Sequence, residues 1–390
     1  MLPLLLIALA QAAVDQPKPI ESLPHPKEAT QPVYLMTIAT SPVDATLAVA
    51  LADGSVWMVD AAKLSVGQRI RCASAAPCII CFAPDGKTIA TGAYSPGFDK
   101  VIWTVAKTDG SGSTISTKVE GSRINESAQF SPDGARLLLH QADGGMILWD
   151  YARELSTKLS PPTEHRLATA CWWGNDKLIS GDSKGVVRVW NADGTLIKSM
   201  PALTSRVDCV DISPDGTRLL TTFGPKARLW RLPDMTLDVE FSSTQTLFIP
   251  DNDGLFGASW SRNRLLLAGG TQFSIECRAF DGSLAWADEF ACGDEKWLIC
   301  SFDPSGTFAS CARNGGNQGR VYEAETGIRR MDGVLATESW DVIEWTGDAQ
   351  CVALLSRSKR SVTIADTKSF ARRGTITSDA HGELTVSKQD

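Results

Sequence analysis

The sequence predicts an all-β protein, a β-propeller of four-stranded antiparallel blades, with eight blades favoured and seven as the alternative. Three observations lead to this prediction. A turn of the Ser-Pro-Asp-Gly type recurs along the chain, short apolar segments flank each copy, and a further alternating strand follows at a regular distance. The 390 residues include 32 Gly and 19 Pro and show no long helical pattern, which indicates many tight turns.

The recurring turn marks the first hairpin of each repeat. Ser-Pro-Asp-Gly stands at 131–134 and 213–216, with variants at 83–86 and 303–306 and a looser copy at 41–44. Proline presets one backbone angle of a tight turn, and Asp-Gly supplies its polar end, where positive φ is tolerated. Because each copy lies between two short apolar segments, we expect two antiparallel strands joined by this turn.

The third strand of each repeat alternates between apolar and polar residues. Examples are the segments 53–60, 143–150, 185–191 and 226–231, and this alternation is typical of half-buried strands. The marker position of this strand recurs eight times, at Val59, Val105, Trp149, Trp190, Trp230, Phe280, Tyr322 and Ala365. Dividing residues 33–376 by eight gives about 43 residues, the period of a four-stranded blade, whereas seven blades would need about 49.

Together these elements resemble the WD40-repeat family. The resemblance rests on the turns, on Asp-Gly before the third strand at 53–54 and 143–144, and on the dipeptide Trp149-Asp150, and it covers residues 33–376. It implies a propeller that binds other proteins as a scaffold and that is not an enzyme.

The resemblance also implies a polar network of His, Ser or Thr, Asp and Trp within each blade. The best match here contains His165, Ser180 and Trp190, with Lys184 at the position where the family has Asp. The other repeats lack the His, so we expect blade stability to come mainly from apolar packing between neighbouring sheets.

The ends of the chain differ from the repeats. Residues 1–12 contain a short apolar run followed by Ala10-Gln11-Ala12, the pattern of a signal peptide cleaved after Ala12 or Ala10. Residues 13–32 are a Pro-rich extended tether, and residues 377–390 are expected to form a C-terminal tail. The leader predicts a secreted or periplasmic protein, and no segment is long and apolar enough to be a transmembrane helix.

Charge and cysteine content narrow the function further. The net charge is −7, which disfavours nucleic acid as the main partner. Four of the ten Cys (81, 171, 209 and 300) precede turns in expected inner strands, where a free thiol packs as a small apolar residue. The Cys-x-x-Cys at 78–81 lies on an expected strand and is a weak metal or redox signal, and the disulfide state stays open.

The loops that join second to third strands, and one blade to the next, lie on one face of a propeller. Residues on such loops are the expected binding residues, and Arg and aromatic side chains dominate interface energies. The candidates are Tyr94, Phe98, Arg123, His165, Arg206, Trp297 and Trp340. The alternative for Trp297 and Trp340 is packing between blades, and for Arg123 and Arg206 it is simple solvation.

The predicted function is non-enzymatic protein binding, with no catalytic residue, metal or cofactor assigned. The Gly-x-Ser-x-Gly at 181–185 lies in an expected hairpin, whereas a hydrolase nucleophile needs a strand-to-helix turn. The segment 280–286 resembles a Trp motif of quinone-cofactor propellers but occurs once. The alternative is a propeller hydrolase or lyase with acidic or metal-binding residues at the channel mouth, from Asp251, Asp253, Asp294, Glu295 and Asp341.

The leader yields a first prediction. We expect the mature protein from its native host to begin after Ala10 or Ala12, because a signal peptidase accepts small residues at this spacing. N-terminal sequencing of the purified protein checks this, and retention of Met1 would overturn the predicted export.

Overall fold

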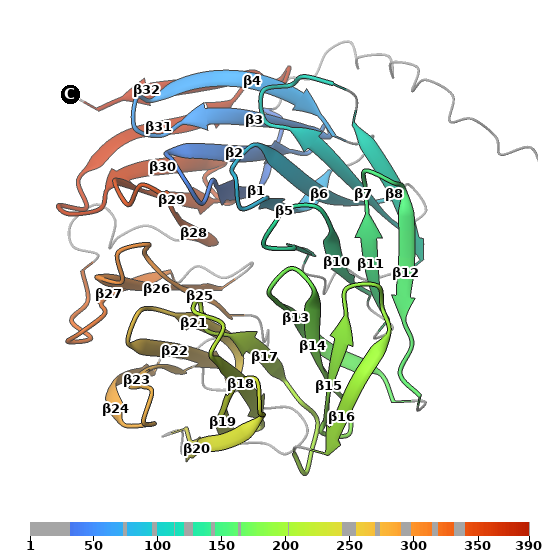
Figure 1. Cartoon of the computed structure of the whole chain (residues 1–390). Coiled ribbons are helices and arrows are strands. Elements are labelled where there is room, and N and C mark those ends of the chain that lie inside the picture. The colour runs from blue at the N-terminus through green and yellow to red at the C-terminus, as the bar shows by residue number, and fades with distance from the viewer. Residues whose placement is uncertain are drawn as a thin grey trace, which may run out of the picture.

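The chain folds into a closed ring of eight antiparallel sheets (Figure 1), which confirms the predicted eight-bladed propeller. The computed structural model describes residues 32–72, 76–95, 100–112, 114–120, 128–141, 145–162, 165–201, 203–243, 255–269, 274–289, 298–313, 319–330 and 340–389. Within these ranges the regular elements are all strands, without a helix.

The strands follow one another outward from the central channel in each blade. Blades 1 and 2 contain β1 (Leu35–Thr40), β2 (Thr46–Leu51), β3 (Ser55–Asp60), β4 (Ser65–Arg71), β5 (Pro77–Phe82), β6 (Thr88–Tyr94), β7 (Lys100–Lys107) and β8 (Ile115–Glu120). Blades 3 and 4 contain β9 (Ala128–Phe130), β10 (Leu137–His140), β11 (Met146–Asp150), β12 (Leu155–Leu159), β13 (Leu167–Trp173), β14 (Lys177–Asp182), β15 (Val186–Asn191) and β16 (Leu196–Pro201).

The second half of the ring repeats this order. Blades 5 and 6 contain β17 (Cys209–Ile212), β18 (Arg218–Phe223), β19 (Lys226–Arg231), β20 (Thr236–Ser242), β21 (Leu255–Trp260), β22 (Arg264–Gly269), β23 (Ser274–Ala279) and β24 (Leu284–Glu289). Blades 7 and 8 contain β25 (Leu298–Phe302), β26 (Phe308–Arg313), β27 (Arg320–Glu323), β28 (Val342–Trp345), β29 (Cys351–Ser356), β30 (Ser361–Asp366), β31 (Arg372–Ser378) and β32 (Leu384–Lys388).

Blades 7 and 8 depart from four strands. Blade 7 has three strands in the described part of the chain, extended by an isolated bridge between Tyr322 and Arg329. Blade 8 has five, because β32 forms within the segment 377–390 that the sequence predicts as a tail. Its alternation of half-buried and exposed residues lets it pair with β31, and the partly buried Leu384 and Val386 pack on the core between blades 8 and 1.

The hydrophobic core lies between the blades. Each of the eight junctions holds one cluster of buried apolar side chains contributed by both neighbours. A single four-stranded sheet has two apolar faces and cannot shield either, so each blade buries both faces on its neighbours. This is why the alternating strands of the sequence give a ring rather than separate units.

The turn between third and fourth strands seats on the outer strand of the preceding blade. Gly327, with φ of +73°, lies so close to Trp286 that an added Cβ would be 2.7 Å from its Cγ. Gly282, with φ of +85°, lies similarly against Phe241, at 3.0 Å. These positions need glycine for two reasons, a left-handed backbone and the close approach of an aromatic ring.

Among the described strands, none is exchanged between the first and the last blade. The amide of Gly347 in blade 8 donates to the carbonyl of Ser41 in blade 1 over 3.1 Å. The hairpin between β31 and β32 adds a second contact, because Trp57 Nε1 donates to the carbonyl of Gly382 over 2.9 Å. The C-terminal strands therefore join blade 8 to blade 1.

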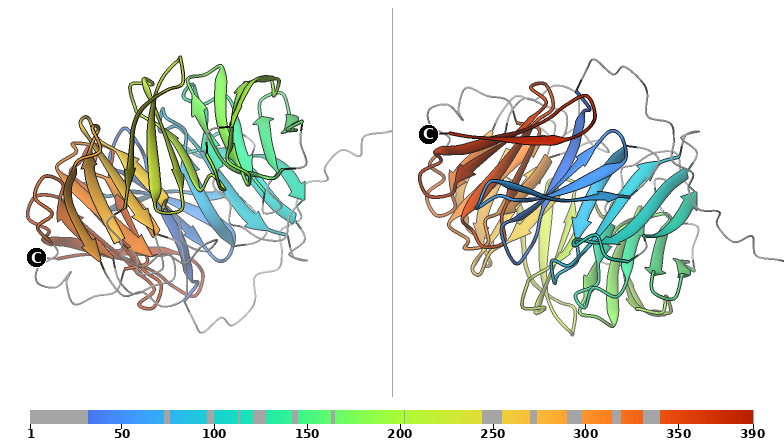
Figure 2. Two further views of the ribbon diagram at one scale, coloured as in Figure 1. Left: turned by 90° about the horizontal axis from the view of Figure 1, so that it is seen from below. Right: turned by 90° about the horizontal axis from the view of Figure 1, so that it is seen from above.

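The strands cross the thickness of the ring, so their connections lie on two opposite faces (Figure 2). We call the side with the loops that join second to third strands, and one blade to the next, the predicted face. The side with the turns that join first to second and third to fourth strands is the opposite face.

A matched pair of glycines tests the packing of these turns. Gly327→Ala should destabilise the fold by at least ~2 kcal/mol more than Gly216→Ala, because an added Cβ at Gly216 meets nothing within 4 Å. Both glycines are left-handed, with φ of +73° and +70°, so backbone strain cancels in the comparison. Chemical denaturation of the two variants measures the difference, and equal losses would contradict the account.

Candidate functional site

The structure describes four of the seven predicted binding residues, and they do not form one cluster. They are Tyr94, His165, Arg206 and Trp340. The other three, Phe98, Arg123 and Trp297, lie outside the described residues.

Trp340 and Tyr94 are packing residues to different degrees. Trp340 is 0% exposed and lies in the core cluster between blades 7 and 8, so the alternative of packing between blades holds for it. Tyr94 is half-buried against the cluster between blades 2 and 3. Only Tyr94 of these two can offer part of its side chain to a partner.

His165 and Arg206 lie at one junction, between blades 4 and 5. The side chains are 37% and 58% exposed, respectively. His165 Nδ1 is 3.3 Å from Asp182 Oδ2, and the backbone carbonyl of Asp182 accepts from the amide of Val207, the neighbour of Arg206. Asp182 thus brings the two predicted residues together on the predicted face.

Two further cations stand beside them that the sequence analysis did not select. Arg166 and Lys184 are exposed, and neither side chain has an ion pair in the described part of the chain. The amide of Ser183 donates to the carbonyl of Arg166 over 2.9 Å, which fixes the two loops side by side. In the sequence, Arg166 and Lys184 are basic residues on two loops of this blade. Lys184 was interpreted only as a departure from the family motif.

Asp182 also supplies the carboxylate that the family pattern places at Lys184. Its Oδ1 accepts from the amides of Lys184 and Val186, at 2.8 and 2.9 Å, and its Oδ2 accepts from Arg188 Nη1 at 2.7 Å. Burial opposes ionisation of this side chain, but the Val186 amide and the Arg188 guanidinium outweigh it and lower the pKa of Asp182. Asp182 therefore occupies the place of the expected Asp, two residues earlier, and His165 Nδ1 approaches it without a hydrogen bond.

Two of the three residues that match the family pattern, Ser180 and Trp190, are joined by a hydrogen bond. Trp190 Nε1 donates to Ser180 Oγ over 2.8 Å, and both side chains are buried. A corresponding bond joins Trp230 to Thr221 in blade 5, at 2.9 Å. The segment 181–185 spans the end of β14 and the turn to β15, as the hairpin interpretation of the Gly-x-Ser-x-Gly spelling predicts.

The inner strands carry a second set of polar links, which cross from one blade to the next. In each link, a donor on one inner strand reaches a side-chain oxygen of the preceding blade. The donors are the backbone amides of Trp172 and Phe302, the indole N–H of Trp260 and the hydroxyl of Thr40. The acceptors stand two residues before the first turn of their blades, at Gln129, Ser259, Asp211 and Glu344. This repeated position ties neighbouring inner strands together.

Two of these acceptors are carboxyl groups in a poorly hydrated setting. Burial raises the pKa of Asp211 to about 6 and that of Glu344 to about 7. The Trp260 and Thr40 hydrogen bonds act in the other direction and do not offset it. Glu344 stands at the junction that closes the ring.

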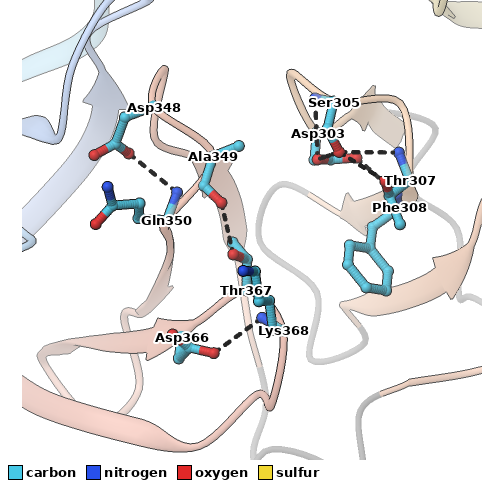
Figure 3. Close-up of a pocket in the computed structure, with 10 residues that line it drawn as sticks. All are labelled: Asp303, Ser305, Thr307, Phe308, Asp348, Ala349, Gln350, Asp366, Thr367 and Lys368. Atoms are coloured by element: carbon cyan, nitrogen blue, oxygen red, sulfur yellow. Dashed lines mark hydrogen bonds between the residues drawn. The ribbon is translucent and has the colours of Figure 1, made fainter.

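A pocket of about 610 Å³ lies at the junction of blades 7 and 8, on the opposite face (Figure 3). It opens between the first turns of the two blades and the turn that joins β30 to β31. The turn of blade 7 leans toward blade 6, where an added Cβ on Gly306 would be 3.3 Å from Ser261 Cβ. The turn of blade 8 leans toward blade 1 through the Gly347–Ser41 bond, so the space between the two turns is left open.

Three aspartates line this pocket and each holds its own turn. Asp303 Oδ1 accepts from the amide of Phe308 at 2.6 Å, and Asp348 Oδ1 accepts from the amide of Gln350 at 3.1 Å. Asp366 Oδ1 accepts from the amide of Lys368 at 3.0 Å. The pocket was not predicted from the sequence because the candidate binding residues lie on loops of the predicted face, and because similar turns recur in every blade.

The structure describes one of the five acidic residues of the enzyme alternative. Asp341 is buried, and its Oδ2 accepts from the amide of Arg357 at 2.7 Å. The other four, Asp251, Asp253, Asp294 and Glu295, lie outside the described residues. Across the ranges the structure covers, three His, Cys, Asp or Glu side chains nowhere gather as a metal would need, and none of the elements is a helix long and apolar enough to cross a membrane.

The cysteines selected from the sequence do lie on innermost strands. Cys81, Cys171, Cys209 and Cys300 belong to β5, β13, β17 and β25 and carry free thiols. Burial raises the pKa of the Cys81 thiol to about 12 and that of Cys171 well above its usual range. Such thiols stay protonated and act as small packing groups.

No family model and no curated protein matches this chain, but its fold is similar to that of solved structures. The C-terminal WD40 domain of Sif2 aligns with a TM-score of 0.63 at 13% identity, over 84% of this chain and 94% of that domain. The chain has the fold of a WD40 propeller. The β-propeller domain of Myceliophteria thermophila Cps50 (Swd1) aligns with a TM-score of 0.55 at 13% identity, over 75% of this chain and 95% of that domain.

The buried carboxyls predict how stability depends on pH. Glu344 binds a proton more tightly in the folded chain than in the unfolded one, so its contribution is favourable at low pH and is lost as pH rises through about 7. Glu344→Gln, which keeps the oxygen that accepts from Thr40, should raise the melting temperature at pH 8 by ~2–5 °C and flatten its fall between about pH 5 and 8.

The control is Glu289→Gln, an exposed glutamate at the end of β24, which should leave both quantities unchanged. Melting curves at the two pH values measure the effect. A variant at Glu344 that melts like the wild type at pH 8 would show that this carboxyl carries no buried charge.

Proposed function

We propose that this protein is a non-enzymatic scaffold that binds a protein partner through the predicted face, in the periplasm or outside the cell. The observation that supports the proposal is the exposed group His165, Arg166, Lys184 and Arg206 on the rigid junction of blades 4 and 5. The proposed location rests on the apolar leader of residues 1–12.

The loops that carry this group are fixed before any partner arrives. Backbone bonds from Ser183 to Arg166 and from Val207 to Asp182 hold them against each other, at 2.9 and 3.0 Å. A preformed loop loses little conformational entropy on binding, and this favours recognition over a flexible surface.

The charges of the group favour an acidic partner surface. Asp182 is buried and paired with Arg188, and Asp208 is 9% exposed at 3.7 Å from Arg206. The cations face solvent while the anions stay behind them. Carboxylates of a partner would find complementary charge here, which raises the rate and specificity of association.

Charge removal at this junction tests the proposal. The variant Arg166→Ala, Lys184→Ala, Arg206→Ala should lose at least ~10-fold in affinity for a protein that the wild type captures from the exported fraction of its native host. The three side chains are exposed and contribute little to stability, so the variant should melt within ~2 °C of the wild type.

The control removes the same number of cations from the opposite face, with Lys63→Ala, Lys87→Ala and Arg153→Ala, and should retain binding. Capture that is equal for both variants would locate the interface elsewhere. Absence of any protein captured by the wild type would contradict the scaffold function itself.

A further inference from the structure

We infer that the pocket between blades 7 and 8 binds a lysine- or arginine-bearing segment of a protein partner. This inference rests on protein binding as the proposed function, but it assigns a second surface, on the opposite face of the ring from the blade 4 and 5 cations.

The pocket exists because of how the ring packs, independently of the charges that line it. Its volume of about 610 Å³ falls in the ~300–1,000 Å³ range of ligand sites in proteins. It forms where the first turns of two adjacent blades lean apart, that of blade 7 toward Ser261 and that of blade 8 toward Ser41. The blade 8 turn is held by the backbone bond from Gly347 to Ser41, and the blade 7 turn lies against the side chain of Ser261.

An aromatic ring forms part of the lining. Phe308 packs parallel to Trp345, with 6.1 Å between ring centroids, and edge-on to Phe370 at 5.2 Å. These contacts with blade 8 fix the ring, and its half-buried side chain leaves part of it open to the pocket (Figure 3). An aromatic ring attracts a cation and covers the methylene stem of Lys or Arg, which an acidic or small polar side chain lacks.

The blade 8 wall supplies unused acceptors. Asp348 and Asp366 each hold their own turn through Oδ1, and neither Oδ2 has a hydrogen bond or ion pair among the described residues. Both carboxylate oxygens of Asp303 accept hydrogen bonds within its own turn. Oδ1 accepts from the amide of Phe308 and Oδ2 accepts from the amide of Ser305. Recognition therefore falls to the two carboxylates of blade 8, which accept from an ammonium or guanidinium group.

The charge balance of the pocket excludes the opposite ligand class. Three aspartates and one lysine, Lys368, line it, and Lys368 is exposed at its edge. An acidic segment or a nucleic-acid backbone would meet two unpaired carboxylates, and a purely apolar segment would desolvate them without compensation. A cationic segment satisfies both the carboxylates and the ring.

The test uses the full chain and a fluorescently labelled Gly-Ser peptide with two arginines, measured by anisotropy at low salt. We expect saturable binding, and no binding of the same peptide with glutamine in place of arginine. The double variant Asp348→Asn, Asp366→Asn should weaken binding at least ~10-fold, because Asn keeps the acceptor that holds each turn and loses only the charge. Lys368→Met should strengthen it.

The matched control is Asp133→Asn. Asp133 holds the equivalent turn of blade 3, where its Oδ1 accepts from the amide of Ala135 at 3.0 Å, and it does not line this pocket. Equal loss in the control and in the double variant would mean unspecific attraction to an acidic protein and would overturn the inference. Peptide binding that stays unchanged in both Lys368→Met and the double variant would also overturn the inference.

The two proposed binding surfaces can be tested independently of each other. The variant that lacks Arg166, Lys184 and Arg206 should bind the arginine peptide as the wild type does, whatever becomes of its protein partner. Loss of peptide binding in that variant would place the peptide on the predicted face and contradict the pocket. Loss of peptide binding only in the blade 8 variant, with partner capture retained, would support the inference on its own.

Discussion

Burial of apolar side chains between neighbouring blades is the interaction on which the rest of this structure depends. Each junction holds its own cluster, and a blade removed from the ring would expose both faces. The polar links of the inner strands and the glycine turns on the outer strands act on sheets that this burial has already brought together. The ring can therefore dispense with a complete set of WD40-type networks.

The same constraint decides where the ring is open. In blades 7 and 8 the first turns lean in opposite directions, toward Ser261 and Ser41. The junction that closes the ring is tightened by Gly347 and by the C-terminal hairpin at Gly382, while the junction before it keeps a pocket. The closed junction and the open pocket therefore both follow from the directions in which these two turns lean.

Repeat period and turn chemistry were enough to predict the blades, their number and the inner-strand cysteines, because these follow from local patterns. The sites were harder, since the burial of Trp340 between blades 7 and 8 depends on contacts across the fold. The fifth strand of blade 8 was missed because Leu384 and Val386 alternate weakly and gain their partner only from β31. The pocket is invisible in the sequence because its turns look like those of every other blade.

Hydrogen–deuterium exchange, resolved by strand and recorded with and without the arginine peptide, tests most directly whether the open junction is the one that binds. The account predicts added protection in the turn before Phe308 and in the blade 8 turns at Asp348 and Lys368, with the other junctions unchanged. Protection that is spread evenly around the ring, or confined to the blade 4 and 5 loops, would contradict it.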